Sequence, residues 1–211
     1  GLHQASVVTL VQATTRRLAT FFEGQPKAVL IIEVDGYPES LQPQMDEVSQ
    51  ILQNCGGRDL RIAQSAAERE KIWYARKSAA GAMARLSPAY LLLDGTVPRS
   101  TLARALETTN QICSEHDLQV GYVFHAGDGN LHPNILFDKR QADQWVRVEQ
   151  MVAEIFAAAL AVGGTLSGEH GVGVLKRPYL ERALGATSLE IQRNIKQALD
   201  PLNILNPGKP F

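Results

Sequence analysis

Apolar residues follow two spacings along the chain, and these spacings predict alternating strands and helices. Short apolar runs rich in β-branched or aromatic residues predict strands over 28–34, 60–63, 90–93, 120–124 and 135–137. Apolar positions three and four residues apart predict helices over 4–22, 41–55, 66–80, 102–113, 141–162 and 188–199. Ser40 and Ser100 precede two of these helices and are expected to cap them.

The order of these elements predicts the fold class. Two β-α-β segments are separated by the helix over 66–80, and the second segment runs into a hairpin. Placed in one sheet, they predict an α+β fold: a ferredoxin-like, split βαβ antiparallel sheet with helices on one face, followed by C-terminal helices. No linker divides the chain, so residues 1–211 are expected to form a single domain.

Composition narrows the class of protein. The 211 residues are 45% hydrophobic and 20% charged, which is typical of a globular protein with a core. The net charge of −1 argues against a nucleic-acid-binding surface built on bulk charge. No apolar run approaches the roughly 18 residues of a membrane span and no signal peptide is visible, so a cytoplasmic location is expected. Cys55 and Cys113 fall on apolar helix positions and are expected to be buried free thiols.

A glycine-rich block between two apolar runs is the first candidate site. It reads His125-Ala-Gly-Asp-Gly-Asn-Leu-His132, and Asp-Gly between such runs is a strong hairpin signal. A two-residue turn at Asp128 and Gly129 would place His125 directly opposite His132, with Cβ atoms roughly 5 Å apart. Two imidazoles at that separation can share a metal ion. The alternative is an ordinary turn, in which Asp128 makes a local hydrogen bond and the histidines are plain polar residues.

A second glycine-rich segment, residues 163–173, presents an acid beside an imidazole at Glu169 and His170. The segment lacks the Gly-Lys-Ser/Thr ending of a phosphate-binding loop. With His125 and His132, Glu169 gives the ligand set of a catalytic divalent metal, with Zn²⁺ as the default and Fe²⁺ or Mn²⁺ as alternatives. Adjacent side chains diverge, so His170 could act as a general base while Glu169 binds metal. A surface carboxylate and a turn histidine are the competing interpretations.

The helix over 66–80 carries two further candidates. Arg76 could clamp a substrate carboxylate through two parallel hydrogen bonds, as guanidinium geometry allows. A solvated charge on the helix surface is the commoner situation for such an arginine. Trp73 is expected to be a core residue rather than a stacking platform.

Several short pieces, spread over most of the chain, carry a family resemblance. They are Trp73-Tyr-Ala-Arg-Lys77, Arg85-Leu-Ser-Pro88, Asp94-Gly-Thr-Val-Pro-Arg99, His125-Ala-Gly-Asp-Gly-Asn-Leu-His-Pro133, Ser167-Gly-Glu-His-Gly171 and Leu205-Asn-Pro-Gly-Lys209. Together they resemble the C-terminal domain of FAD-linked oxidases of the vanillyl-alcohol oxidase type. The two histidine-containing blocks are specific to that family, and the piece that begins at Asp94 resembles its glycolate oxidase branch.

The resemblance implies a flavin-dependent D-2-hydroxy-acid dehydrogenase. In that reaction hydride passes from the substrate carbon to FAD, the hydroxyl proton leaves to a base, and a 2-oxo acid forms. The resemblance implies His125, His132 and Glu169 as ligands of the metal cofactor. It implies His170 as the base.

The resemblance also implies contacts to substrate and flavin. Arg76 and Asn134 match positions that bind substrate, and the tail that begins at Asn206 matches a segment near the flavin ring. Residues 91–93 are leucines where related 2-hydroxyglutarate enzymes carry a lysine. This departure favours a small monocarboxylate, with glycolate first and D-lactate as the alternative.

The resemblance implies further parts beyond these residues. The family's FAD-binding domain precedes the matching segment and is expected to be absent from residues 1–211, so FAD would be held mainly elsewhere and this piece alone would not turn over substrate. The implied partners are that domain, a companion iron–sulfur subunit and a second copy of the chain, with peripheral attachment to the inner membrane through the companions. A non-catalytic metal-binding or docking module and a free-standing zinc hydrolase stay open as alternatives, although the HExxH spacing is missing.

Overall fold

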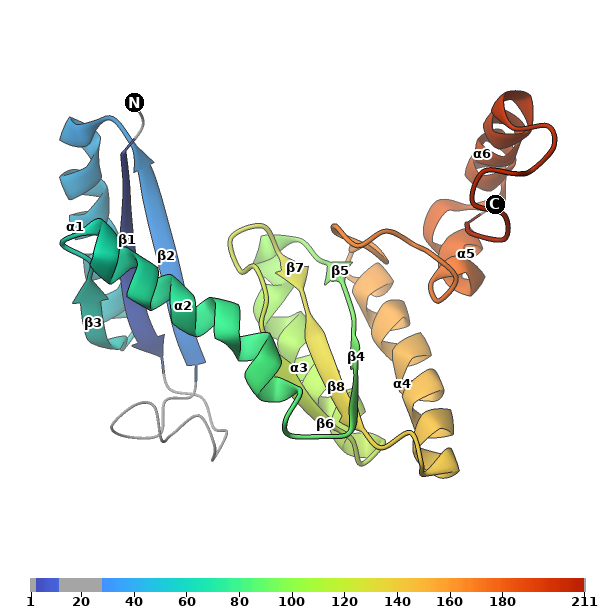
Figure 1. The fold of residues 1–211 in the computed structure, drawn as a ribbon, viewed down its shortest axis with the longest axis horizontal. Coiled ribbons are helices and arrows are strands. Elements are labelled where there is room, and N and C mark those ends of the chain that lie inside the picture. The colour runs from blue at the N-terminus through green and yellow to red at the C-terminus, as the bar shows by residue number, and fades with distance from the viewer. Residues whose placement is uncertain (1–2, 12–27, 211) are drawn as a thin grey trace. The chain divides into compact units, whose positions relative to one another are not determined.

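The computed structural model describes residues 3–11 and 28–210. Its contacts divide the chain into two compact units, with the boundary between Ser78 and Ala79. This boundary lies inside a helix, α2 (Ala66–Met83), and not in a linker. Figure 1 shows the elements of both units. The grouping of residues 1–211 as one domain stays a prediction.

The first unit is a three-stranded antiparallel sheet covered by one helix. Its strand order is β2 (Ala28–Gly36), β1 (His3–Val11) and β3 (Arg58–Ile62). Helix α1 (Pro38–Asn54) leads from β2 to β3 and packs on β1 and β2. Because β2 and β3 both run antiparallel to β1, they form a split β-α-β unit with β1 between its strands.

The helix predicted over 4–22 is wrong where the structure describes it, because residues 3–11 form β1. The helical spacing of the apolar residues was misleading, since this segment is also rich in β-branched valine and threonine. Pairing with β2 along the whole strand selects the strand over the helix. Residues 12–22 of the predicted helix lie outside the described residues.

The second unit is also a split β-α-β sheet, but its central strand follows the β-α-β segment in the chain instead of preceding it. Its sheet has the order β4 (Ala89–Leu92), β8 (Pro133–Phe137) and β6 (Gln119–Tyr122), all antiparallel neighbours. Helix α3 (Leu102–Glu115) leads from β4 to β6, and β8 lies between these two parallel strands. A separate two-stranded sheet pairs β5 (Gly95–Thr96) with β7 (Asn130–Leu131), which lies in the connection between β6 and β8. The fold is therefore mixed α and β with small antiparallel sheets, whereas a ferredoxin-like arrangement of both units in one sheet is not confirmed.

Two helices build the core of the second unit. α4 (Ala142–Ala161) packs on α3 and β8, and its apolar stripe meets the fully buried Ile135. Cys113 lies in this core, 3.6 Å from the sulfur of Met151, and burial raises the pKa of its thiol to about 11. Cys55 is exposed, which corrects its predicted burial, because it caps the end of α1 just before the turn at Gly56.

Both predicted serine caps are wrong. α1 begins at Pro38 after Tyr37, and the Ser40 hydroxyl donates a hydrogen bond to the Tyr37 carbonyl inside the first turn. A proline at the first helical position is favourable because its missing N–H needs no partner there. Ser100 lies within a short 3₁₀ helix, η1 (Arg99–Thr101), that precedes α3.

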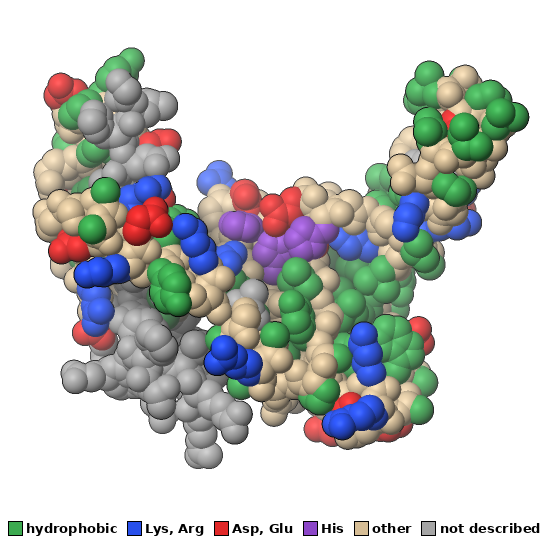
Figure 2. All heavy atoms as spheres, viewed as in Figure 1, with side chains coloured by type: hydrophobic (Ala, Val, Ile, Leu, Met, Phe, Trp, Pro, Cys, Tyr) green, Lys and Arg blue, Asp and Glu red, His purple; other side chains and the backbone are tan. Residues whose placement is uncertain are grey.

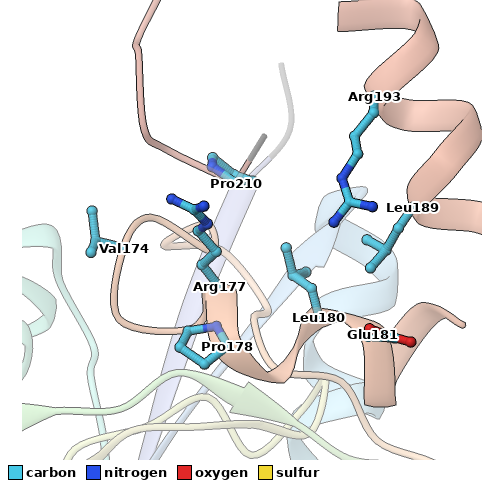
Figure 3. A pocket seen from close by; sticks show the side chains of 8 residues that line it. All are labelled: Val174, Arg177, Pro178, Leu180, Glu181, Leu189, Arg193 and Pro210. Atoms are coloured by element: carbon cyan, nitrogen blue, oxygen red, sulfur yellow. The ribbon is translucent and has the colours of Figure 1, made fainter. Parts of the chain in front are cut away.

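The C-terminal part consists of η2 (Arg177–Tyr179), α5 (Leu180–Leu184), α6 (Ala186–Leu199) and a turn-rich tail. A cavity of about 340 Å³ lies between these elements, and Figure 3 shows Arg177 and Arg193 beside it. The Arg177 guanidinium donates to the carbonyl of Gly208, which ties the tail to η2. Among the described helices, none has the length and apolar character needed to cross a bilayer.

Candidate metal centre

The hairpin between β6 and β8 carries both predicted histidine ligands. His125 pairs with Asn130 and not with His132, so the predicted two-residue turn and direct opposition are wrong. The two-residue turn that Asp-Gly favours, type I′, needs positive φ at both central residues. Of Asp128 and Gly129, only Gly129 has a positive φ. The register differs from the prediction by two residues, and side chains alternate with a period of two, so both imidazoles still share one face. Their ring centroids are 5.4 Å apart.

The turn itself has clear local causes. The Asp128 carboxylate accepts a hydrogen bond from the Asn130 N–H at 3.0 Å, in agreement with its predicted role in the turn. Gly129 has φ of +81°, and a Cβ there would lie 2.1 Å from the Val97 carbonyl oxygen. The close approach of Val97 therefore requires glycine at this position.

His132 is buried and held in one tautomer. Its Nδ1 lies 3.3 Å from the carbonyl oxygen of Leu93. A carbonyl only accepts, so the proton of a neutral His132 is on Nδ1 and its Nε2 carries a free lone pair. This Nε2 lies 2.9 Å from Oε1 of Glu169. Two acceptors at that distance need a cation or an additional proton between them.

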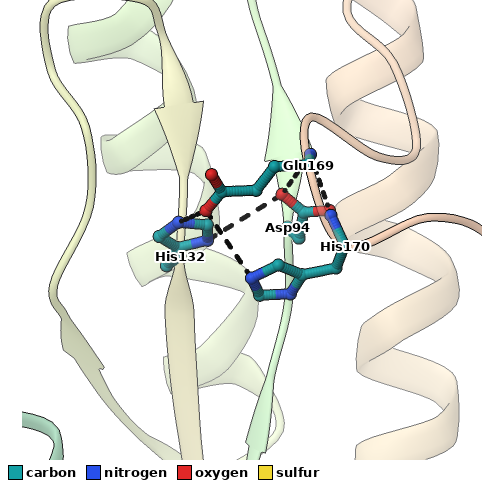
Figure 4. A group of neighbouring side chains, drawn as sticks. All are labelled: Asp94, His132, Glu169 and His170. Carbon is teal, nitrogen blue, oxygen red and sulfur yellow. Dashed lines mark hydrogen bonds and ion pairs between the residues drawn. The ribbon is translucent and has the colours of Figure 1, made fainter.

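Glu169 is the point where three imidazoles converge. Its Oε1 lies 2.9 Å from Nε2 of His132, 3.7 Å from Nε2 of His125 and 3.6 Å from Nε2 of His170. Figure 4 shows His132 and His170 both facing this carboxylate. Their rings are stacked, with a centroid distance of 5.0 Å. Figure 2 shows the histidine side chains gathered in one patch beside acidic groups. Glu169, His125 and His170 are each about half exposed, so a ligand can reach them.

Asp94 lies under this cluster and is fully buried at the end of β4. Burial alone would raise the pKa of its carboxyl group. Hydrogen bonds from the Ser167 hydroxyl, the N–H of His170, the Lys176 ammonium and the N–H of Glu169 outweigh burial and hold the pKa of Asp94 far below its usual range. Neither Asp94 nor Lys176 was predicted from the sequence as a site residue. An aspartate directly after an apolar strand was a usable signal for the first, whereas nothing local distinguishes the lysine.

The other predicted site residues lie in different places. Asn134 is buried, and its amide nitrogen donates to the carbonyls of His132 at 2.9 Å and Gly121 at 3.4 Å. Arg76 lies half-buried on α2, in the first unit. Trp73, on the same helix, has a buried indole N–H without a hydrogen-bond partner among the described residues. Asn206 begins a turn of the tail that closes through the N–H of Lys209.

A sequence profile of the family described as FAD linked oxidases, C-terminal domain, matches residues 5–210. The chain belongs to this family. It is 44% identical over 185 residues to glycolate oxidase subunit GlcD of Bacillus subtilis, an alignment that covers 88% of this chain and 39% of that protein. It is 34% identical over 182 residues to the mitochondrial D-lactate dehydrogenase [cytochrome] of Arabidopsis thaliana, covering 85% of this chain and 32% of that one.

A solved structure supports the fold of this family member. The structure of p-cresol methylhydroxylase with bound substrate matches 98% of this chain and 46% of that chain, with a TM-score of 0.64 and 12% identity. At that identity the likeness concerns the fold alone. The chain spans about two fifths of the length of the glycolate oxidase subunits that it matches.

Gly168 places the Glu169 loop against the hairpin, and we expect Gly168→Ala to disturb it. A Cβ there would lie 2.3 Å from Oγ1 of Thr96 and 2.7 Å from the side-chain amide of Asn130. The Thr96 Oγ1 and Asn130 Oδ1 atoms are both buried, so they have little room to move. We expect a loss of about 1–3 kcal/mol in the free energy of unfolding, typical of overpacking. Gly127→Ala is the matched control, because nothing lies within 4 Å of a Cβ there. Equal thermal unfolding of both variants would contradict this prediction.

Proposed function

We propose that this chain is the substrate- and metal-binding domain of a flavin-dependent D-2-hydroxy-acid dehydrogenase that oxidises glycolate to glyoxylate. The observation that carries the proposal is the convergence of three imidazole Nε2 atoms on one oxygen of Glu169. The proposal draws support from relatives named as glycolate oxidase subunit GlcD at 40–44% identity.

The residues present fit a divalent metal. His125, His132 and Glu169 would hold it, with Zn²⁺ as the first candidate and Fe²⁺ or Mn²⁺ as alternatives. The free lone pair of His132 Nε2, which faces a carboxylate oxygen 2.9 Å away, is the observation that favours a cation there. Ligand atoms of Asp94, His132, Glu169 and His170 also lie within 4.8 Å of one another. Asp94 already accepts four hydrogen bonds, so we do not count it as a ligand.

The remaining side chains would act on the substrate. When bound, the metal would lower the pKa of the substrate hydroxyl, and FAD would accept the hydride. His170 would take the hydroxyl proton at Nε2, which lies on the cluster side of its ring, 3.6 Å from Glu169. Arg76 would bind the substrate carboxylate, and Asn134 would be the second substrate-binding residue. The leucines at 91–93 favour a small monocarboxylate.

The rest of the assembly belongs to the same proposal. FAD would be held mainly by an N-terminal domain, and the tail that begins at Asn206 would lie near the flavin ring. Glu169 would bind the other cofactor, the metal. Companion subunits, one with iron–sulfur clusters, would accept the electrons. They would attach a cytoplasmic protein to the periphery of the inner membrane. A homo-oligomer of the chain is compatible with this arrangement.

D-Lactate dehydrogenation is the second candidate, favoured by the 34% identical relative of that name. The deciding experiment is anaerobic mixing of the full-length protein with glycolate, D-lactate, L-lactate and D-2-hydroxyglutarate while flavin absorbance is followed. We expect the fastest flavin bleaching with glycolate and none with L-lactate. Faster bleaching with D-lactate would favour the second candidate. Flavin that is reduced by none of the four acids would contradict both.

A further inference from the structure

The two residues that follow strand β4, Leu93 and Asp94, contact both chain segments that carry the predicted metal ligands. The carbonyl of Leu93 accepts the Nδ1–H of His132, as described above. The next residue, Asp94, accepts hydrogen bonds from three consecutive N–H groups of the second glycine-rich segment. Its carbonyl accepts from Gly168 at 3.0 Å, and its carboxylate accepts from Glu169 at 3.2 Å and His170 at 2.8 Å. Two consecutive residues between β4 and β5 thus orient His132, Glu169 and His170 together.

The carboxylate of Asp94 has no capacity left for a metal. Beyond the two N–H groups, it accepts the Ser167 hydroxyl at 2.6 Å and the Lys176 ammonium at 3.1 Å. The side chains of Asp94 and Lys176 are 0% and 7% exposed. A buried charge pair of this kind is stable only when both members are present and hydrogen-bonded. All donors to the carboxylate come from the segment that contains Glu169 or from the residues just after it.

We propose that Asp94 is a positioning residue that fixes the loop 167–170 so that Glu169 faces His132, with Lys176 as its buried counterion. The inference rests on the proposed metal site and adds the part that preorganises it. Asp94 acts through the backbone of the loop and does not touch the metal. An asparagine at this position would turn an NH₂ group toward donors that need an acceptor, and Glu169 would lose its fixed position. Loss of such supporting groups typically costs about 10–100-fold in metal affinity.

The test measures metal binding to the full-length protein without reference to turnover. Zn²⁺ affinity is determined by competition with a chromophoric chelator, and the Co²⁺-loaded protein is examined by visible absorption. We expect Asp94→Asn to weaken Zn²⁺ binding by about 10–100-fold and to alter the Co²⁺ bands. Asp138→Asn is the control, because Asp138 pairs with Arg140 and lies outside the cluster; it should bind like the wild type.

Further variants separate positioning from folding. Asp94→Asn leaves the buried ammonium of Lys176 without its counterion, so its melting temperature should fall. Combining it with Lys176→Met removes that charge, and we expect the melting temperature to recover while Zn²⁺ affinity stays low. If neither variant folds, Ser167→Ala decides, because it removes one donor to the same carboxylate and leaves the buried Asp94–Lys176 charge pair intact. It should weaken Zn²⁺ binding severalfold.

The outcomes distinguish this inference from the metal site on which it rests. Wild-type affinity and an unchanged Co²⁺ spectrum in Asp94→Asn, or in the double variant, would overturn the positioning role even if His132→Ala abolishes binding. If neither Asp94 variant folds, unchanged Zn²⁺ affinity in Ser167→Ala would overturn the positioning role. If wild type and His132→Ala bind Zn²⁺ equally weakly, the metal site fails and the role of Asp94 fails with it.

Discussion

His132→Ala is expected to leave the full-length protein without tightly bound divalent metal. His132 is the most buried of the three imidazoles, and its Nε2 makes the shortest contact to Glu169, at 2.9 Å. Its orientation is fixed by the Leu93 carbonyl, so no other side chain can replace it at that position. Because supporting residues alone account for about 10–100-fold in metal affinity, loss of this ligand should exceed 100-fold. Elemental analysis after extensive dialysis measures the metal content.

A histidine of the same unit that lies outside the cluster provides the control for this prediction. His116, which caps the C-terminal end of α3, lies 3.0 Å from Glu154 of α4 and outside the cluster. His116→Ala should therefore retain metal. A chelator supplies an independent check, since a metal that binds only the folded state raises its stability. The chelator should lower the melting temperature of wild type and of His116→Ala and leave that of His132→Ala unchanged. Full metal content in His132→Ala would disprove the assigned ligand set.

The residues of the site could be predicted from the sequence, but the geometry of the turn that carries the histidines could not. His125 and His132 were predicted to face each other across a two-residue turn, and the turn is longer. The prediction of a shared face survived because an error of two residues in register does not change the face of a strand. An error of one residue would have pointed one ring away from the other. The approach of Glu169 was inferred from the chemistry of the ligand set and was also implied by the family resemblance, since no local pattern relates residues 163–173 to the hairpin.

The contacts that hold the loop could not be predicted, because they are tertiary. Asp94 and Lys176 are 82 positions apart, and the sequence around the lysine resembles any exposed loop. The prediction for the segment that forms β1 was wrong for a related reason. Its apolar residues fit a helix as well as a strand, and only pairing with β2 selects the strand. The β-α-β order within each unit was readable from the alternation of elements. The strand inserted in the first unit and the separation into two small sheets were not.

His170→Gln is expected to lose flavin reduction while it retains metal. In the proposed assignment His170 is the base, and removal of a general base typically costs about 10²–10⁴-fold in rate. The ring of His170 stacks on His132 at an angle of 8°, so its Nε2 lies beside the metal ligands without being required among them. Glutamine keeps a polar side chain of similar length and cannot accept the proton at neutral pH. Stopped-flow flavin reduction and elemental analysis on the same preparation measure both properties.

His125→Gln is the matched variant, because the Nε2 atoms of His125 and His170 are almost equally far from Glu169, at 3.7 and 3.6 Å. Distance alone therefore does not separate ligand from base, but the two variants do. With the assignment proposed here, His125→Gln loses metal and activity together, and His170→Gln loses activity alone. The reverse pattern would exchange the two roles and make His132, Glu169 and His170 the ligands. Normal flavin reduction in His170→Gln would remove the base from the mechanism, because the other imidazoles of the cluster would already be bound to metal.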